Sequence, residues 1–436
     1  MLKKILIGAG IVVAAIVAFV LLALSAPTLT IALHPRPDQS SVHVPEPMEA
    51  PGTRYFVDPK LLPPPMMDPD TYNSSALLER TDETKLRLPE GFEASIFAEG
   101  LDAPRWMTLA PNGDVFLTES SAGKVIVLRD TNNDGRADRE ETYAEGFDLP
   151  HGMAFHGDYF YVADVKGVWR FPYRAGDVKG GERQMITPPG AFGVADNHWT
   201  RNILFSPDGS TFLVTIGSRG NLRLELEPSA TLQQFNADGS GMTTYARGLR
   251  NPVGLAYYPG TRNLFVTAVE RDQRGDRVAP DFFTQVERND FFGWPFAYAG
   301  RHFEPRFGFL RPDLVLSTKT PDVLIEAHSV PLGLMFYDRD QFPEEYRGDA
   351  FIAMHGSWNR TSPSGYMIAR VRFENGRPVG GYEVFASGFW VSGQNPANII
   401  GRPVALLIAP DGSLLVSDDA ANVVWRISYK GSAGRP

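Results

Sequence analysis

Short apolar runs, separated by Pro-Asx-Gly turns, organise the chain from about residue 88 onward. Examples are "LAPNGDVFLTES", "FSPDGSTFLVTIG" and "IAPDGSLLVSDD", and "YYPGTRNLFVTAV" is a variant of the same unit. A glycine-containing turn between two runs of β-branched and aromatic residues predicts a β-hairpin. The pattern therefore predicts a chain built from repeated hairpins.

These hairpin units recur with a period of about 50 residues, which is typical of propellers built from four-stranded sheets. The turn prolines are Pro111, Pro207, Pro259 and Pro410, and degenerate copies lie near residues 157 and 338. Six copies predict an all-β fold, a six-bladed β-propeller over residues 88–432. The strand "FEASIFAEG" near residue 92 is expected to close the ring with the last blade.

The first 25 residues predict a membrane segment. Lys3 and Lys4 precede "ILIGAGIVVAAIVAFVLLAL", an uncharged stretch long enough for a transmembrane helix. Because lysines stay on the cytoplasmic side, we expect the remainder in the bacterial periplasm, anchored to the inner membrane by residues 5–24. A cleaved signal peptide is the alternative. Residues 26–87 are rich in proline and predict an extended tether.

Composition narrows the possible functions. The 436 residues carry a net charge of −9, which argues against a nucleic-acid partner. The chain has no cysteine, which excludes disulfides, thiolate nucleophiles, iron–sulfur clusters and cysteine-ligated zinc. The absence of thiols also suits an oxidising compartment.

Alignment of the six copies shows a basic residue just before the first strand of each. These residues are Arg105, His151, His198 (with Arg201), Arg250, His328 and Arg402. In a propeller such positions converge on the axis at one face, where like charges are costly without an anion. The pattern predicts a site for a polyanionic small molecule. The alternative is that each residue bonds locally to a neighbouring blade.

Two further stretches carry candidate chemistry beside this ring. "DNHWTRN" places His198 at the ring, where an imidazole can act as a general base near neutral pH. "AVERDQRGDRVAPD" follows the strand after Arg250, and its acidic and carbonyl oxygens are donors that suit Ca²⁺. A solvated acidic loop is the alternative for the second stretch.

A separate stretch, "DTNNDGRADREE", has the acidic spacing of an EF-hand loop without the flanking helices. We expect a structural calcium clip in a hairpin connection, and an Asx-rich turn without an ion is the alternative. The candidate ligands are Asp130, Asn132, Asp134, Asp138 and Glu141, with the carbonyl of Arg136.

Several motifs together resemble the sorbosone dehydrogenase family. They are "ARGLRNPVGLAY", "HWTRNILFSPDG", "FFGWPFAY" and "MHGSWNRTSPSGY". That family is similar to the soluble aldose dehydrogenases, six-bladed propellers that use pyrroloquinoline quinone (PQQ) and Ca²⁺. The resemblance runs from about residue 88 to 430 and implies oxidation of a sugar or sugar-derived alcohol or aldehyde. An external electron acceptor, a quinone or a cytochrome, is then expected.

The resemblance also assigns roles to residues. It implies that His198 is the catalytic base and that Arg250, Asn251 and Arg402 contact PQQ. The segment from Glu270 through Asp272 to Gln273 falls where the family holds calcium. The family's PQQ-contacting lysine has no counterpart in "FIAMHGSWNR", where Arg360 or His355 is the nearest substitute. Arg105 and His328 complete the expected cofactor contacts.

Two other functions remain open at this point. A calcium-dependent lactonase would also be a six-bladed propeller, but it would hold a metal with carboxylates at the axis. A binding propeller of the NHL type would need no histidine there. Uptake of PQQ separates both from a quinoprotein dehydrogenase.

Overall fold

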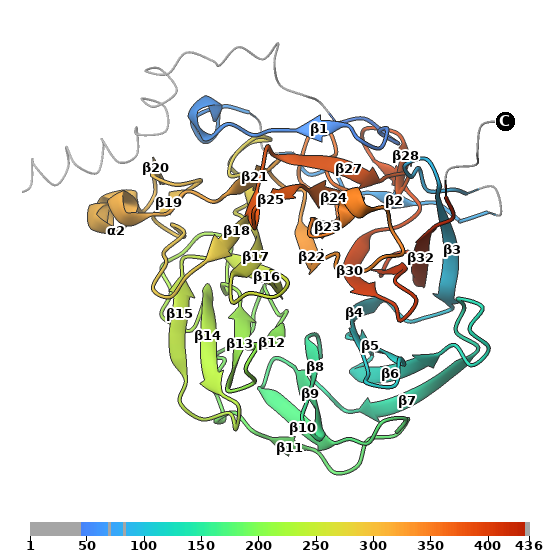
Figure 1. The fold of residues 1–436 in the computed structure, drawn as a ribbon. Helices are drawn as coiled ribbons and strands as arrows, with labels where there is room; N and C mark the ends of the chain where they lie inside the picture. Colours follow the sequence, from blue (N-terminus) through green and yellow to red (C-terminus); the bar gives the residue numbers. More distant parts are fainter. Residues whose placement is uncertain (1–44, 69–70, 82–83, 432–436) are drawn as a thin grey trace, which may run out of the picture.

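The computed structural model describes residues 45–68, 71–81 and 84–431, and the fold is nearly all β. Figure 1 shows its main sheets arranged around a common centre. Six antiparallel sheets contain four or five strands each. The fold is therefore β-propeller-like, as the hairpin pattern predicted.

The six sheets follow one another along the chain, and each runs from an inner strand outward. Their strands, sheet by sheet, are β4 (Pro104–Leu109), β5 (Val115–Glu119), β6 (Lys124–Arg129) and β7 (Arg139–Glu145); β8 (Met153–His156), β9 (Tyr159–Ala163), β10 (Val168–Pro172) and β11 (Gln184–Met185); β12 (Ile203–Phe205), β13 (Thr211–Ile216), β14 (Thr231–Asn236) and β15 (Thr243–Arg247); β16 (Asn251–Tyr257), β17 (Leu264–Val269), β18 (Asp281–Val286) and β21 (Val323–Ile325); β22 (Pro331–Phe336), β23 (Ala350–Met354), β24 (Met367–Val371), β27 (Tyr382–Ala386) and β1 (Arg54–Tyr55); and β30 (Pro403–Ile408), β31 (Leu414–Asp418), β32 (Val423–Tyr429) and β3 (Phe92–Glu99).

The inner strands contact one another in a cycle. β4 contacts β8, β8 contacts β12, and the contacts continue through β16, β22 and β30 back to β4. The outer strand β3, which precedes the first sheet in sequence, pairs with β32 of the last sheet. The predicted pairing of the strand near residue 92 with the last repeat is confirmed. A late strand and an early strand therefore share one sheet, which ties the two ends of this region together.

Hairpin turns and interleaved aromatic residues explain this architecture. At the first Pro-Asx-Gly turn, Gly113 has a φ of 92°, a conformation that glycine adopts without steric cost. Between the first two sheets, Phe116 lies against Tyr143, Phe155 and Phe160 in edge-on or tilted contacts. Burial of each such ring stabilises the fold by roughly 1.5–3 kcal/mol. The sheets are thus held together face to face by their apolar side chains.

The described part of the proline-rich segment lies against this body. β1 extends the fifth sheet by pairing with β27, and β2 (Ala76–Leu77) pairs in parallel with β29 (Asn398–Ile399), which also pairs with β28 (Trp390–Ser392). Figure 1 shows β1 along the outer edge of that sheet. The remaining short elements are β19 (Ala297–Tyr298), β20 (His302–Phe303), β25 (Phe373–Glu374), β26 (Arg377–Pro378), η2 (Pro59–Leu61), η3 (Gly308–Leu310), α2 (Pro312–Ser317) and η4 (Glu344–Tyr346).

The predicted membrane helix at residues 5–24 lies outside the described residues. Within the described part of the chain, no helix has the length and apolar character needed to cross a bilayer. The α-helix α2 has six residues, whereas a span needs about 20. We therefore correct the localisation predicted from the sequence: the structure gives no support for anchoring of this chain in the inner membrane.

Candidate active site

Prolines at the start of the inner strands set the entrance of the central region. Pro104, Pro252, Pro331 and Pro403 each begin or nearly begin an inner strand, and each is followed by an irregularity in strand pairing. Proline cannot donate a ladder hydrogen bond, and a bulge turns neighbouring side chains out of the regular alternation. Residues next to these prolines, such as Asn251 and Arg402, are therefore presented at the ends of the inner strands.

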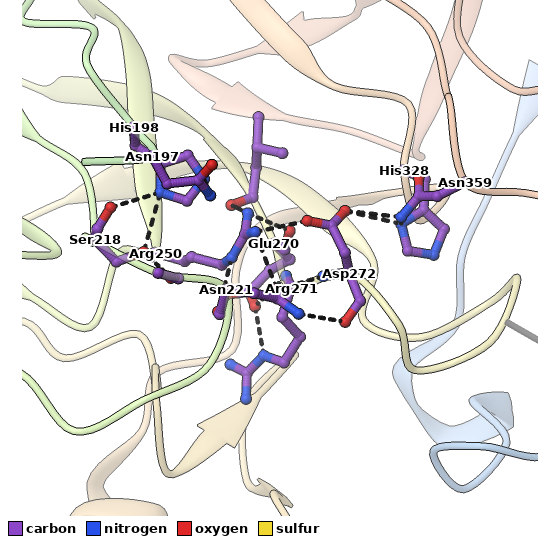
Figure 2. Close-up of polar contacts among 12 residues, drawn as sticks. Asn197, His198, Ser218, Asn221, Arg250, Glu270, Arg271, Asp272, His328 and Asn359 are labelled. Carbon is purple, nitrogen blue, oxygen red and sulfur yellow. Dashed lines mark hydrogen bonds and ion pairs between the residues drawn. The ribbon is translucent and has the colours of Figure 1, made fainter. Parts of the chain in front are cut away.

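His198 is held in one orientation just before the third inner strand. Its Nδ1 lies 2.8 Å from the carbonyl oxygen of Ser218, and because a carbonyl only accepts, Nδ1 carries the proton. Nε2 is then the basic nitrogen, and the Asn197 amide donates to it at 3.3 Å. Figure 2 shows this arrangement. The tautomer leaves the lone pair of Nε2 as the reactive group.

The electrostatic environment keeps His198 neutral. Burial and the positive charge of Arg250 lower the pKa of His198 to about 3. The folded protein therefore binds a proton at His198 less readily than the unfolded chain does. The free energy of unfolding is expected to fall as the pH drops from about 6.5 toward 3. A neutral imidazole is the form that a general base needs.

We expect the His198 imidazole of the cofactor-free protein to stay neutral and Nδ1-protonated from pH 8 down to pH 5. Heteronuclear NMR of the ring nitrogens in this pH range measures both the charge and the tautomer. The same protein unfolded in urea is the reference, because a free histidine titrates near pH 6.5. A His198 signal that titrates midway in this range in the folded protein would contradict the proposed environment.

Gly217 leaves room between His198 and Asn251. A side chain at Gly217 would place its first carbon 2.5 Å from the His198 Cβ and 2.6 Å from Asn251 Oδ1. That Oδ1 is buried and has no hydrogen-bond partner in the described part of the chain. Glycine at position 217 therefore lets both side chains pack closely against the backbone there.

Arg250 and Asp272 form a buried ion pair beside His198. The Arg250 guanidinium is 1% exposed and donates to Asp272 Oδ2 at 2.7 Å. Its other donors reach Asn221 and the carbonyls of Val269 and Glu270. Burial alone would raise the pKa of Asp272, but Arg250 and His328 hold it at about 2. The carboxylate is therefore ionised and the guanidinium is fully occupied by protein acceptors.

The Asp272 carboxylate connects this pair to His328. Asn359 donates to Asp272 Oδ1 at 2.8 Å, and His328 Nδ1 lies 3.7 Å from the same oxygen. The other ring nitrogen of His328 lies 3.0 Å from the carbonyl of Gly275. Figure 2 shows these groups on one side of Arg250 and His198 on the other. The network spans three neighbouring sheets.

A second network occupies the other side of the ring. Asp419 accepts from Arg105 and lies 2.8 Å from His355 Nε2. Although burial opposes it, the pKa of Asp419 is held well below its usual range by His355 and Arg105. Arg402 donates to the carbonyls of His355 and Gly356 at 3.0 and 2.7 Å. Two of the predicted cofactor arginines, Arg105 and Arg402, therefore lie together.

His151 and Arg201 lie between the two networks. His151 is fully buried, neither ring nitrogen has a partner among the described residues, and its ring packs between Trp106 and Trp199. Burial and the charges of Arg105 and Arg201 lower the pKa of His151 well below its usual value. Arg201 donates to the carbonyls of His198 and Thr200. The predicted cations are therefore near neighbours.

Charge balance indicates what this site can hold. Asp272 and Asp419 form ion pairs with Arg250 and Arg105, whereas in the described part of the chain the side chains of Arg201 and Arg402 hydrogen-bond to carbonyls and form no ion pair. Burial lowers the pKa of Arg201 to about 10 and lowers that of Arg402, yet Arg201 stays charged at neutral pH. Two largely buried guanidinium groups without a carboxylate fit a multiply charged anion, because such charges need compensation. The residues present therefore fit PQQ.

Arg360 does not join this ring. It is 5% exposed, and its NH1 donates to Glu326 Oε2 at 3.3 Å. Burial opposes its charge, but Glu326 and Asp276 raise the pKa of Arg360 above its usual value. The neighbouring Asn359 side chain contacts Asp272 beside the ring. Arg360 instead lines a separate cavity.

Most oxygen atoms of the predicted calcium segment beside the ring already accept hydrogen bonds, and Glu270 Oε1 is the buried one without a partner among the described residues. The Glu270 carbonyl accepts from Arg250 at 2.7 Å, and the Asp272 carbonyl accepts from Asn221 at 2.9 Å. The Glu270 carboxylate bonds Arg271 at 2.9 Å, and the Gln273 carbonyl accepts from Arg274 at 3.2 Å. These contacts do not fit a Ca²⁺ coordination sphere of six to eight oxygens. No group of three or more His or acidic residues suited to a metal occurs in the described ranges.

The EF-hand-like loop folds as a series of Asx turns. Asp130 accepts from the backbone N–H of Gly135 at 2.8 Å, Asp134 from that of Arg136 at 2.9 Å, and Asp138 from Thr131. Asn132 bonds Asp134, the Arg136 side chain reaches Glu99, and Glu141 lies in β7. The candidate ligands bond their own backbone and do not converge, so this geometry fits the turn and not the clip.

Ser218, Asn221 and Asp419 each support a ring residue but were not predicted from the sequence. Ser218 follows β13, as Asp272 follows β17, His355 follows β23 and Asp419 follows β31. These four residues share one signal, a polar residue one to three positions after the second strand of a repeat, whereas Asn221 lies five positions after β13. Aligning the repeats at that position, as well as before the first strand, predicts the partners.

Comparison with known proteins agrees with this geometry. The family model of TrAA12-like proteins matches residues 86–279 and 315–430. The chain belongs to the TrAA12-like family. The match covers most strands of the six sheets and the candidate site, but it leaves out β18 and begins after the segment that carries β1 and β2.

Individual relatives match most of this TrAA12-like chain. An uncharacterised protein from Borreliella burgdorferi is 27% identical over 361 residues, 79% of this chain and 91% of that protein. A PQQ-dependent pyranose dehydrogenase from Coprinopsis cinerea is 24% identical, with 79% of this chain and 54% of that protein covered. The alignment thus spans about half of the second relative.

Solved structures share the fold. The holo PQQ domain of the Coprinopsis cinerea pyranose dehydrogenase superposes with a TM-score of 0.67 at 20% identity, covering 81% of this chain and 100% of that domain. A Trichoderma reesei AA12 enzyme gives 0.65 at 19% identity, with 80% and 98% covered. The predicted resemblance to soluble PQQ-dependent sugar dehydrogenases is confirmed.

Proposed function

We propose that this chain is a PQQ-dependent dehydrogenase that oxidises a sugar or a sugar-derived alcohol or aldehyde. In this proposal the six sheets are the blades of a six-bladed propeller, and the cofactor binds where the inner strands begin. The observation that carries it is the pair Arg201 and Arg402, largely buried guanidinium groups without a carboxylate partner. The relation to PQQ-dependent sugar dehydrogenases supports the choice of anion.

The residues of the chain divide into holding and proton-transfer roles. Arg201, Arg402 and Arg105 would hold the carboxylates of PQQ, and Asn251 would border it. Arg250 and Asp272, which satisfy each other, fix the wall of the site. The chemistry that PQQ supplies when bound is acceptance of two electrons with a hydride from a substrate carbon.

His198 would remove the proton of the substrate hydroxyl. Its Nε2 lone pair is available because Nδ1 donates to the Ser218 carbonyl, and the lowered pKa keeps the ring neutral before substrate binds. The carbonyl of Ser218 then stabilises the imidazolium that forms. Oxidation of an aldose hydroxyl in this way gives a lactone, and the electrons leave to an external quinone or cytochrome.

Reconstitution with PQQ tests this function directly. We expect the purified full chain to bind PQQ with a change in its absorbance and then to reduce a dye with aldopyranoses. Replacing Arg402 with glutamine is expected to weaken PQQ binding at least tenfold, because a charged hydrogen bond to a carboxylate contributes about 1.5–3 kcal/mol. Arg426→Gln is the matched control, since Arg426 lies in β32 of the same sheet and bonds Asp411.

The outcomes distinguish the competing functions. Failure to take up PQQ, with or without added Ca²⁺, would contradict the proposal. Calcium-dependent hydrolysis of a lactone by the same preparation would favour a lactonase. Equal loss of PQQ binding in Arg402→Gln and Arg426→Gln would remove Arg402 from the site.

A further inference from the structure

A cavity of about 450 Å³ lies between the N-terminal segment and the sheets. The segment from Arg54 to Pro63 forms one wall. The other wall is formed by Asp276, Arg277, Glu326, Ala327 and Arg360. The family match begins at residue 86, so the first wall belongs to a part of the chain outside that match. The cavity therefore has one wall outside the family match and one wall inside it.

Arg360 is the polar centre of this cavity. Its side chain is 5% exposed, and its Nε has no hydrogen-bond partner among the described residues. Leaving a buried N–H group unsatisfied costs about 1–3 kcal/mol. An oxygen acceptor from a ligand in the cavity would satisfy it.

The charges around the cavity balance one another. Arg360 pairs with Glu326 at 3.3 Å, Arg277 with Asp68 at 2.9 Å, and Arg54 with Glu383 at 3.4 Å. Because the lining itself carries three arginines (Arg54, Arg277 and Arg360) and three carboxylates (Asp58, Asp276 and Glu326), it favours neither an anion nor a cation. It offers donors and acceptors side by side, which matches a neutral molecule rich in hydroxyl groups.

An aromatic face completes the lining. Phe56 borders the cavity and is 73% exposed, which leaves one side of a large ring open. The apolar face of a sugar ring packs on such a surface while its hydroxyls reach the polar groups opposite. The size of the cavity suits one or two sugar rings.

We propose that this cavity is a second binding site, for a neutral saccharide, next to the candidate active site. Asn359 and Arg360 form the shared wall: Asn359 bonds Asp272 on the site side, and Arg360 lines the cavity. The assignment rests on the lining of the cavity and does not depend on PQQ. It therefore stands or falls separately from the proposed function.

Calorimetric titration of the full chain without PQQ tests this site, with glucose, maltose and cellobiose as probes. We expect saturable binding of at least one of them, and Phe56→Ala should weaken it at least tenfold. Tyr72→Ala is the matched control, because Tyr72 is an exposed aromatic residue of the same N-terminal segment, contacts Trp358 and does not line the cavity. Thermal melting confirms that both variants are folded.

Three results would overturn the proposal. They are no binding of any of the three sugars to the wild-type chain, equal weakening by Phe56→Ala and Tyr72→Ala, or tighter binding of gluconate than of the neutral sugars. Sugar binding that persists in a preparation unable to take up PQQ would support the cavity site while contradicting the proposed redox function.

Discussion

Replacing His198 with alanine is expected to lower the turnover of the PQQ-loaded protein by about 10²–10⁴-fold, the usual contribution of a general base. The reason is local: Nε2 is the one nitrogen of this ring that carries a lone pair, since Nδ1 donates to Ser218, and the Asn197 amide reaches Nε2 only at 3.3 Å. PQQ binding should change less than threefold, because the holding groups are arginines. Steady-state kinetics with a dye acceptor, together with a PQQ titration, measures both quantities.

His302→Ala is the matched control for this experiment. His302 also places Nδ1 against a carbonyl, that of Ala299 at 3.0 Å, but it lies in the short strand β20 and not in the ring. Its replacement should leave turnover within a factor of two. If His198→Ala turns over at the wild-type rate, or if it loses PQQ binding to the same extent as turnover, His198 is not the base.

Local sequence pattern predicted the hairpins because the signals are short range. A turn such as that at Gly113 and the alternation on either side lie within about a dozen residues. The ring followed from the same register, since a basic residue lies within a few positions of the start of each inner strand. The cations therefore converge because the sheets repeat, and no knowledge of side-chain contacts was needed.

The charge balance of the ring could not be predicted in this way. Asp419 pairs with Arg105, which is more than three hundred positions away in sequence, and no local pattern links them. The acidic loop at Asp130 was misleading for a different reason, because its side chains accept hydrogen bonds from the backbone of the same loop. Spacing alone does not distinguish such turns from a calcium loop.

The N-terminal segment also escaped prediction, for a physical reason. β1 and β2 have two residues each, which is too short for any alternation to appear. Their positions come from contacts with distant strands and from ion pairs such as that of Asp68 with Arg277. A segment without a period of its own can still form one wall of a cavity.

Replacing Arg250 with methionine is expected to lower the free energy of unfolding by about 3–5 kcal/mol, the usual cost of breaking a buried ion pair from one side. The variant leaves the Asp272 carboxylate without its main partner and also removes one donor each from Asn221 Oδ1 and the Glu270 carbonyl. Urea unfolding followed by fluorescence measures the loss. Arg250 holds the pKa of Asp272 near 2, so in the wild-type protein the ionised Asp272 contributes stability that is lost as the pH falls from about 4 to 2. This pH-dependent contribution should be absent in the variant.

Arg247→Met is the matched control, three residues earlier in the same chain segment. Arg247 pairs with Glu227, and both side chains are nearly half exposed, so the loss should stay below about 1 kcal/mol. The double variant Arg250→Met/Asp272→Leu should recover part of the stability, since it removes the uncompensated charge. Equal losses of unfolding free energy for Arg250→Met and Arg247→Met would mean that the buried ion pair does not stabilise the wall of the site.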